Sequence, residues 1–179
     1  MGSPSEPSHQ HSMPFADALD AGIQAIGRVF AWSYVLLVAV IILQVVLRYG
    51  FNQGLVMLEE LQWHLYALGV MFGVSYAQTT NSHIRVDLFH MRMSRRRQAW
   101  VEVLGILFLL LPFVYVVLSN SFGFVYDAWR INESSAAPTG LPWRWLIKSV
   151  IPLSFALLGL AACARLLREL HFLFHRPAH

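Results

Sequence analysis

The chain has 179 residues, of which 56% are hydrophobic and 13% are charged, whereas a soluble domain carries roughly a quarter charged residues. This balance excludes an ordinary soluble domain and predicts an all-α membrane protein. The net charge of +3 comes from arginines that flank apolar segments, with no stacking aromatics between them, so it does not indicate nucleic-acid binding. The single cysteine, Cys163, excludes an internal disulfide and a thiolate metal cage.

Four apolar segments follow a polar start. Residues 1–20, rich in Ser, Pro and His at their beginning, are expected to form a mobile tail. The run 29–47 carries no charge, and about 20 apolar residues at a rise of 1.5 Å cross a hydrocarbon core of roughly 30 Å. It exceeds the roughly 7 to 15 residues of a signal-peptide core and is expected to stay in the mature protein. Three further transmembrane helices are predicted at 61–80, 103–126 and 145–164.

The four helices define a membrane domain, 21–170, followed by a C-terminal tail, 171–179. With four spans, both termini and the second loop lie on one side, which holds nine of the 13 Lys and Arg residues, while the other side holds four. Lys and Arg are enriched in cytoplasmic flanks, so both termini and the second loop are predicted in the cytoplasm. The nine are Arg28, Arg85, Arg92, Arg95, Arg96, Arg97, Arg165, Arg168 and Arg176, and the four are Arg48, Arg130, Arg144 and Lys148.

Short interfacial segments are predicted in two loops. The polar stretch NSHIRVDLF at 81–89 begins the predicted cytoplasmic loop, where Asn81 or Ser82 is expected to cap a short amphipathic helix. A second amphipathic segment is predicted on the outer surface around Trp129 and Ile131. Both segments should lie on the membrane surface rather than cross it.

Ionisable residues avoid the middles of all four predicted spans, which excludes an ion pathway through this chain alone. His64 is the one histidine within a span, and a haem held by two histidines would need a second at matching depth. An interfacial or interhelical hydrogen bond is therefore the favoured role for His64. The serine-hydrolase and zinc-protease motifs are also absent from the sequence. No catalytic, cofactor or metal site is predicted.

An ion pair is predicted near the outer interface. Glu59 and Glu60 begin the second helix, where the helix dipole favours anions, and Arg48 ends the first helix. Pairing of Arg48 with Glu60 is geometrically allowed, and the alternative is a solvated helix start. Acidic groups close to hydrocarbon are expensive unless they have a partner, which favours the pair.

Small and aromatic residues predict the packing of the helices. Gly69, Gly73 and Ala77 recur at every fourth position of the second helix and predict a small-residue seam where another helix can approach closely. The seam is compatible with a helix of this chain or of a partner. Tryptophans at span ends predict an aromatic belt at the bilayer interfaces. They are Trp63, Trp100, Trp129, Trp143 and Trp145.

Four motifs in this order resemble the small membrane subunit of tripartite ATP-independent periplasmic (TRAP) transporters. They are LRYGFN at 47–52, LEELQWH at 58–64, NSHIRVDLF at 81–89 and GLPWRWLIKSVIPLSFALL at 140–158. The resemblance covers about 21–170. It implies a non-catalytic protein of the bacterial inner membrane with four helices and both termini inside.

The resemblance also implies partners. It predicts a large multi-span membrane subunit with the transport domain and sodium sites, and a periplasmic binding protein that delivers an organic acid. The small subunit would act as a scaffold within the lipid bilayer. The motif positions imply ion pairing for Arg48, Glu59 and Glu60, loop geometry for His83, Arg85 and Asp87, and subunit contact for Gly140, Pro142, Lys148 and Pro152.

Two other functions stay open at the level of the sequence. A membrane anchor of a redox enzyme would show a bound chromophore and paired histidines within the membrane. A freestanding assembly factor would be stable alone, and its deletion would leave uptake unchanged.

Overall fold

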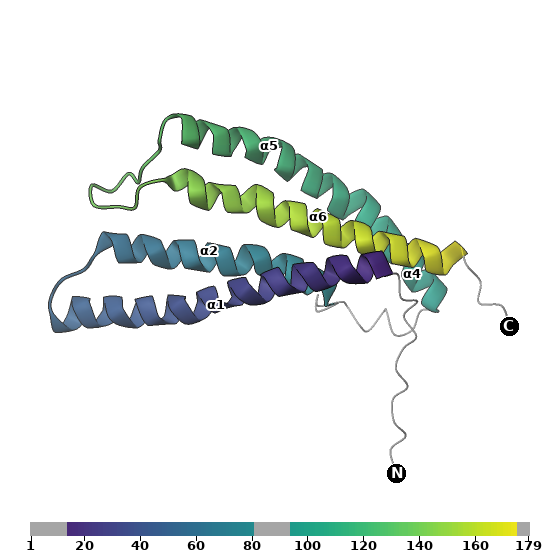
Figure 1. Cartoon of the computed structure of the whole chain (residues 1–179), viewed down its shortest axis with the longest axis horizontal. Helices are drawn as coiled ribbons and strands as arrows, with labels where there is room; N and C mark the ends of the chain where they lie inside the picture. The colour runs from purple at the N-terminus through teal and green to yellow at the C-terminus, as the bar shows by residue number, and fades with distance from the viewer. Residues whose placement is uncertain (1–13, 81–93, 175–179) are drawn as a thin grey trace, which may run out of the picture.

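The computed structural model describes residues 14–80 and 94–174 as an assembly of helices (Figure 1). The predicted all-helical class is confirmed for these ranges, which contain no strand. The helices are α1 Pro14–Gly50, α2 Val56–Thr79, α4 Arg95–Gly105, the π-helical turn η1 Ile106–Leu110, α5 Leu111–Arg130 and α6 Arg144–Phe174.

The long helices form two hairpins that lie side by side (Figure 1). α1 packs along α2, α5 packs along α6, and α2 and α6 contact each other in the middle. α4 also packs on α6 and continues through η1 into α5. α1 and α5 therefore lie at the outer edges, each with one packed face and one open face.

Three stretches are long and apolar enough to cross a membrane, namely Asp17–Gly50, Arg95–Arg130 and Arg144–Phe174. α2 is not among them, although its 24 residues are about 36 Å long at helical rise. Polar residues at its two ends lower its hydropathy, and Ser75 and Gln78 among them are buried. The predicted second span is thus a helix of suitable length, and some of its polar side chains are buried between neighbouring helices.

The described helices reach further toward both termini than the sequence predicts. α1 begins at Pro14, so residues 14–20 are helical rather than part of a tail. α6 continues to Phe174, past the predicted boundary at 170. The added start of α1 carries Asp17 and Asp20, which both pair with an arginine of α6. This contact between distant parts of the chain holds the start of α1 against α6.

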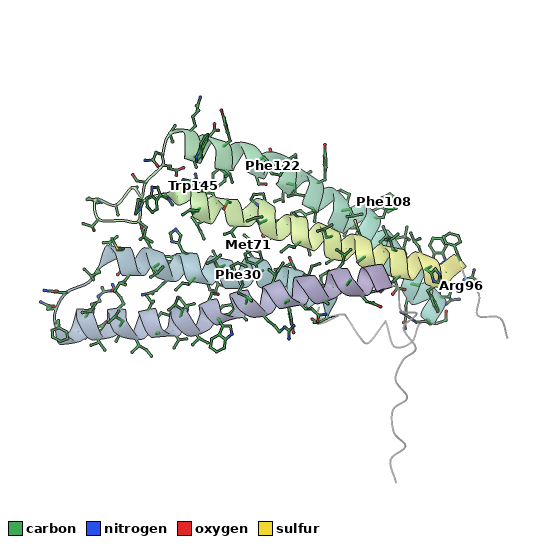
Figure 2. All side chains as sticks on the ribbon, in the orientation of Figure 1. Phe30, Met71, Arg96, Phe108, Phe122 and Trp145 are labelled. Carbon is green, nitrogen blue, oxygen red and sulfur yellow. The ribbon has the colours of Figure 1, made fainter. Side chains whose placement is uncertain are left out.

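Aromatic rings and glycines bring α1 and α2 together. Phe30 lies between the two helices (Figure 2) and stacks on Phe72, with the ring centroids 3.8 Å apart. Gly27 of α1 lies against Tyr76 of α2, and a Cβ at Gly27 would be 2.8 Å from Cβ of Tyr76. Such a distance is shorter than real Cβ contacts, so the helices can approach here only because residue 27 has no side chain.

The predicted seam on α2 makes this kind of contact at one of its three positions. A Cβ at Gly69 would lie 2.5 Å from the ring of Tyr34, whereas one at Gly73 would meet nothing within 4 Å, and Ala77 is half-buried. An α-helix has 3.6 residues per turn, so every fourth residue is rotated by about 40° from the one before. Gly73 and Ala77 therefore turn away from the face that Gly69 presents to α1.

Gly27→Ala is expected to destabilise the protein by about 1–3 kcal/mol, because the new methyl group overlaps Cβ of Tyr76, an atom fixed close to the α2 backbone. Gly22→Ala is the matched control on the same helix, since its Cβ would meet nothing within 4 Å. That change should be neutral or stabilising, because alanine favours helix over glycine by about 1 kcal/mol. Thermal unfolding in detergent, followed by circular dichroism, measures both. Equal midpoints for the two variants would contradict the close approach of α1 and α2.

Candidate functional site

Glu60 of α2 connects the first hairpin to the loop 131–143 of the second. Its carboxylate accepts a hydrogen bond from the Ser135 hydroxyl and another, at 2.6 Å, from the backbone N–H of Leu141. Gly140 packs against both Glu60 and Ser135. A Cβ on Gly140 would lie 2.8 Å from Oε1 of Glu60 and closer still to Ser135. The missing side chain at Gly140 therefore allows the loop to close over Glu60.

The loop 131–143 has a defined backbone. The N–H of Ser135 donates to the carbonyl of Leu141 at 3.2 Å, and the N–H of Arg144 donates to the carbonyl of Glu133 at 3.0 Å. Trp143 adopts a left-handed backbone with φ of 60°, which is rare for a bulky residue. Its side chain is 58% exposed. The loop thus presents a tryptophan outward at the start of α6, in a conformation that its neighbours must maintain.

Charged residues tie the same loop to α6. Glu133 pairs closely with Lys148 and lies 4.0 Å from Arg144. The ammonium group of Lys148 also lies 3.9 Å from the centre of the Phe124 ring, and its side chain is only 15% exposed. Because a cation over an aromatic face is stabilised when it is withdrawn from water, Lys148 contributes to contacts within the chain.

The four residues predicted for subunit contact therefore differ in accessibility. Gly140 and Lys148 are engaged within the loop and with α5, and Pro152 is buried inside α6. Pro142 is exposed. Of the four, Pro142 is the one that the described structure leaves open for a partner.

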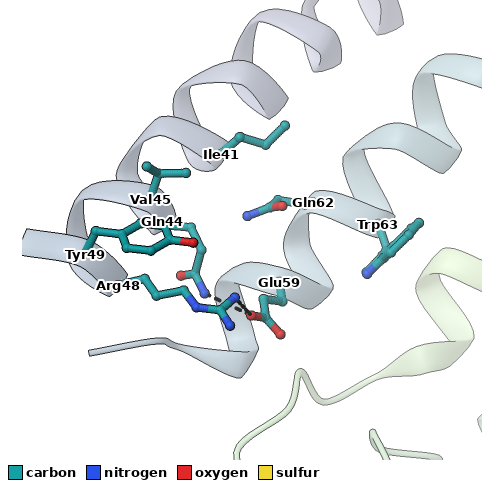
Figure 3. A pocket seen from close by; sticks show the side chains of 8 residues that line it. All are labelled: Ile41, Gln44, Val45, Arg48, Tyr49, Glu59, Gln62 and Trp63. Carbon is teal, nitrogen blue, oxygen red and sulfur yellow. Dashed lines mark hydrogen bonds and ion pairs between the residues drawn. The ribbon is translucent and has the colours of Figure 1, made fainter. Parts of the chain in front are cut away.

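Arg48 faces Glu59 and not Glu60 (Figure 3). Nη1 of Arg48 is 3.9 Å from Oε1 of Glu59, and the two side chains are 63% and 48% exposed. The predicted pairing of Arg48 with Glu60 is wrong for a geometric reason. Successive residues of a helix are rotated by about 100°, so Glu60 points toward the α5–α6 loop. A loose and exposed pair of this kind contributes about 0–1 kcal/mol.

A cavity of about 370 Å³ lies between α1 and α2 beside this pair. Gln44 is buried and donates from Nε2 to Oε1 of Glu59 at 3.3 Å. Gln62 points from α2 toward α1 (Figure 3). The wall combines these polar groups with apolar side chains such as Ile41 and Val45. The cavity is thus polar at the helix ends and apolar toward the middle of the helices.

His64 makes a hydrogen bond within its own helix. Its Nδ1 lies 2.6 Å from the carbonyl oxygen of Glu60, one turn earlier. The bond is therefore not the interhelical one that the sequence allows. The predicted loop motif, His83, Arg85 and Asp87, lies outside the described residues. Over the ranges 14–80 and 94–174, no three His, Cys, Asp or Glu side chains are grouped so that they could hold a metal ion.

Sequence reasoning missed a second cluster, at the end of the bundle where both chain termini lie. Arg168 of α6 bonds to Asp17 at 2.7 Å and to Asp20 at 2.5 Å, both on α1. Arg165, one turn earlier, pairs with Glu102 of α4, and both side chains are 13% exposed. One turn of α6 thus joins α1 and α4.

A signal for this cluster exists in the sequence. Arg165, Arg168 and Glu169 are spaced three and four apart, which places them on one helical face. Glu169 completes the cluster through Arg95, 3.4 Å away. These arginines look like ordinary flanking charges in the sequence, because their acidic partners lie on distant helices.

The pKa of Glu60 lies below the usual glutamate value, mainly because of the Ser135 hydroxyl and then the Leu141 N–H and the nearby charge of Arg144. A lowered pKa stabilises the fold fully above the ordinary glutamate range and loses this effect as pH falls through the folded-state value. Glu60→Gln should therefore destabilise the protein at pH 7, and its difference from the unmutated chain should shrink below about pH 4. Thermal midpoints across this range measure the effect. A difference that does not change with pH would contradict the charge-assisted contacts.

The comparisons with known proteins agree with one another. The family described as "Tripartite ATP-independent periplasmic transporters, DctQ component" matches residues 37–172, a range that includes Glu60 and the loop 131–143. A protein of Haemophilus influenzae, named provisionally as a TRAP transporter small permease protein, is 26% identical over 135 residues. The alignment covers 75% of this chain and 80% of that protein. No solved structure matches the chain.

Proposed function

Because the chain belongs to the DctQ component family of the tripartite ATP-independent periplasmic transporters, we propose that it stabilises the large transport subunit during sodium-driven uptake of an organic acid. The proposed partners are that large multi-span subunit and a periplasmic substrate-binding protein. The proposed location is the bacterial inner membrane, with four spans in the domain 21–170 and both termini in the cytoplasm. The tails outside this domain would then extend from its cytoplasmic side.

The observation that carries the proposal is the separation of polar ends from apolar outer faces. Phe108 of η1 and Phe122 of α5 point outward (Figure 2) and are 65% and 63% exposed. On α1, Trp32 is 71% exposed. Apolar faces of this extent need lipid or a partner helix to cover them. The ion pairs lie at the ends of the bundle, where they join helices of the same chain. These properties favour a frame that supports a neighbouring protein in the membrane.

Uptake measurements in proteoliposomes test the proposal. The large subunit reconstituted together with this chain should import an organic acid under an inward sodium gradient when loaded binding protein is added. Omission of this chain should abolish that uptake, and this chain alone should move no organic acid. Uptake by the purified chain alone would overturn the supporting role, and full uptake without it would favour an assembly factor instead.

A further inference from the structure

Two hydrogen-bonding groups without a partner are enclosed behind the wall of the cavity between α1 and α2. Gln44 is only 6% exposed, and its Nε2 donates to Oε1 of Glu59. A carboxylate can only accept, so this bond fixes the amide orientation and directs Oε1 of Gln44 away from Glu59. That oxygen is buried and has no partner among residues 14–80 and 94–174, and the same holds for Nε2 of Gln62. Both atoms are closed off from the cavity itself, so a molecule in it meets the charged rim and the apolar wall instead.

The rim of the cavity carries one charge of each sign. Arg48 and Glu59 are 3.9 Å apart and about half exposed, so each keeps hydrogen-bonding capacity for a ligand. A simple anion near Arg48 would be repelled by Glu59, and a simple cation near Glu59 would be repelled by Arg48. A zwitterion with its two charges a few ångströms apart satisfies both residues together.

The position of the cavity indicates where such a zwitterion would come from. Arg48 directly follows the uncharged run 29–47, so the cavity lies where a membrane helix reaches the polar surface. Ile41 and Val45 line its apolar part. About 370 Å³ is far more than the roughly 30 Å³ that one water molecule occupies. A polar end joined to an apolar wall matches the headgroup and upper acyl chains of a lipid.

We propose that this cavity binds a phosphatidylethanolamine molecule of the adjacent leaflet. The phosphate accepts hydrogen bonds from the Arg48 guanidinium, and the ammonium group donates to the Glu59 carboxylate. The acyl chains follow Ile41 and Val45. This site goes beyond the proposed transport role and does not depend on it.

Lipid retention tests the site. The full chain is reconstituted in vesicles with equal amounts of phosphatidylethanolamine and phosphatidylglycerol and is then extracted in mild detergent. Mass spectrometry of the bound lipid should show phosphatidylethanolamine enriched over phosphatidylglycerol. Arg48→Gln should lower the retained phosphatidylethanolamine about tenfold, which is the size expected for one charge-assisted contact. Arg130 is an exposed arginine at the C-terminal end of α5, as Arg48 is near the C-terminal end of α1. Arg130→Gln is therefore the matched control and should leave retention unchanged.

A change of preference distinguishes recognition from general damage to the fold. Glu59→Gln removes the anionic group and leaves Arg48, so the bound lipid should change from phosphatidylethanolamine to phosphatidylglycerol. Equal retention of both lipids by the unmutated chain, retention of neither, or an unchanged preference in Glu59→Gln would overturn the proposal. Soluble glycerophosphoethanolamine should fail to displace the lipid. Displacement by this headgroup alone would also overturn the lipid assignment.

Discussion

Arg168→Ala is expected to destabilise the protein by about 2–4 kcal/mol. Arg168 bonds to Asp17 and Asp20, and the Asp20 side chain is only 11% exposed. Breaking a buried ion pair costs about 3–5 kcal/mol, because the remaining charge keeps its desolvation penalty. The partial exposure of Arg168, 25%, reduces that figure. Thermal unfolding measures the loss, and hydrogen exchange at residues 17–24 should show that α1 separates from α6.

Two further variants distinguish the ion pair from simple loss of a long side chain. Arg28→Ala removes an exposed arginine of α1 that forms no ion pair within residues 14–80 and 94–174, and it should change the unfolding midpoint little. Asp17→Asn with Asp20→Asn in the Arg168→Leu background removes the charges on both sides and should recover much of the stability. No recovery in this triple variant would contradict the assignment of the loss to an uncompensated Asp20.

Gly140→Val is expected to open the loop 131–143. The Cβ that it adds would lie 2.8 Å from Oε1 of Glu60 and closer to Cβ of Ser135, an atom that cannot move without the loop backbone. Overpacking of this kind costs about 1–3 kcal/mol, and the bonds of Glu60 to the loop should be lost as well. Limited proteolysis should then cleave within the loop many times faster. Uptake by the complete transporter should fall in parallel, if the proposed subunit contact uses this loop.

Gly123→Val provides the control for this experiment. Gly123 lies on α5 of the same hairpin, and a Cβ there would meet nothing within 4 Å. The loop of this variant should resist protease as the unmutated loop does. Equal protection of the Gly140→Val loop would show that the close contact with Glu60 does not hold the loop.

The sequence predicts the helices well because apolar runs depend on local composition alone. It places Glu60 with Arg48 because the two lie close to the same short turn between the first two helices. The structure instead directs Glu60 to Leu141, 81 positions later, a contact that exists only because α2 lies beside α6. The close approach at Gly27 escapes prediction for the same reason, since its partner Tyr76 belongs to another helix.

The π-helical turn η1 keeps two halves of one long helix in phase. A stripe of buried residues runs along α4, η1 and α5, with Val103 beside it. Its members are spaced seven apart except for one interval of eight between Ile106 and Val114, and they are Ala99, Ile106, Val114, Ser121 and Ala128. The turn contains that interval, and its wide ring closes with a bond from the N–H of Leu111 to the carbonyl of Ile106. Seven residues make nearly two full α-turns, so an eighth would rotate all later side chains by about 100° in a regular helix.

The wide turn absorbs this extra residue. Deletion of Leu109 should therefore convert η1 into an ordinary α-turn and leave the buried stripe of Val114, Ser121 and Ala128 facing α6. The same deletion at Val117 would rotate the outer half of α5 toward the lipid. A change in helix length is thus tolerated at one place in this span and disruptive a few turns away.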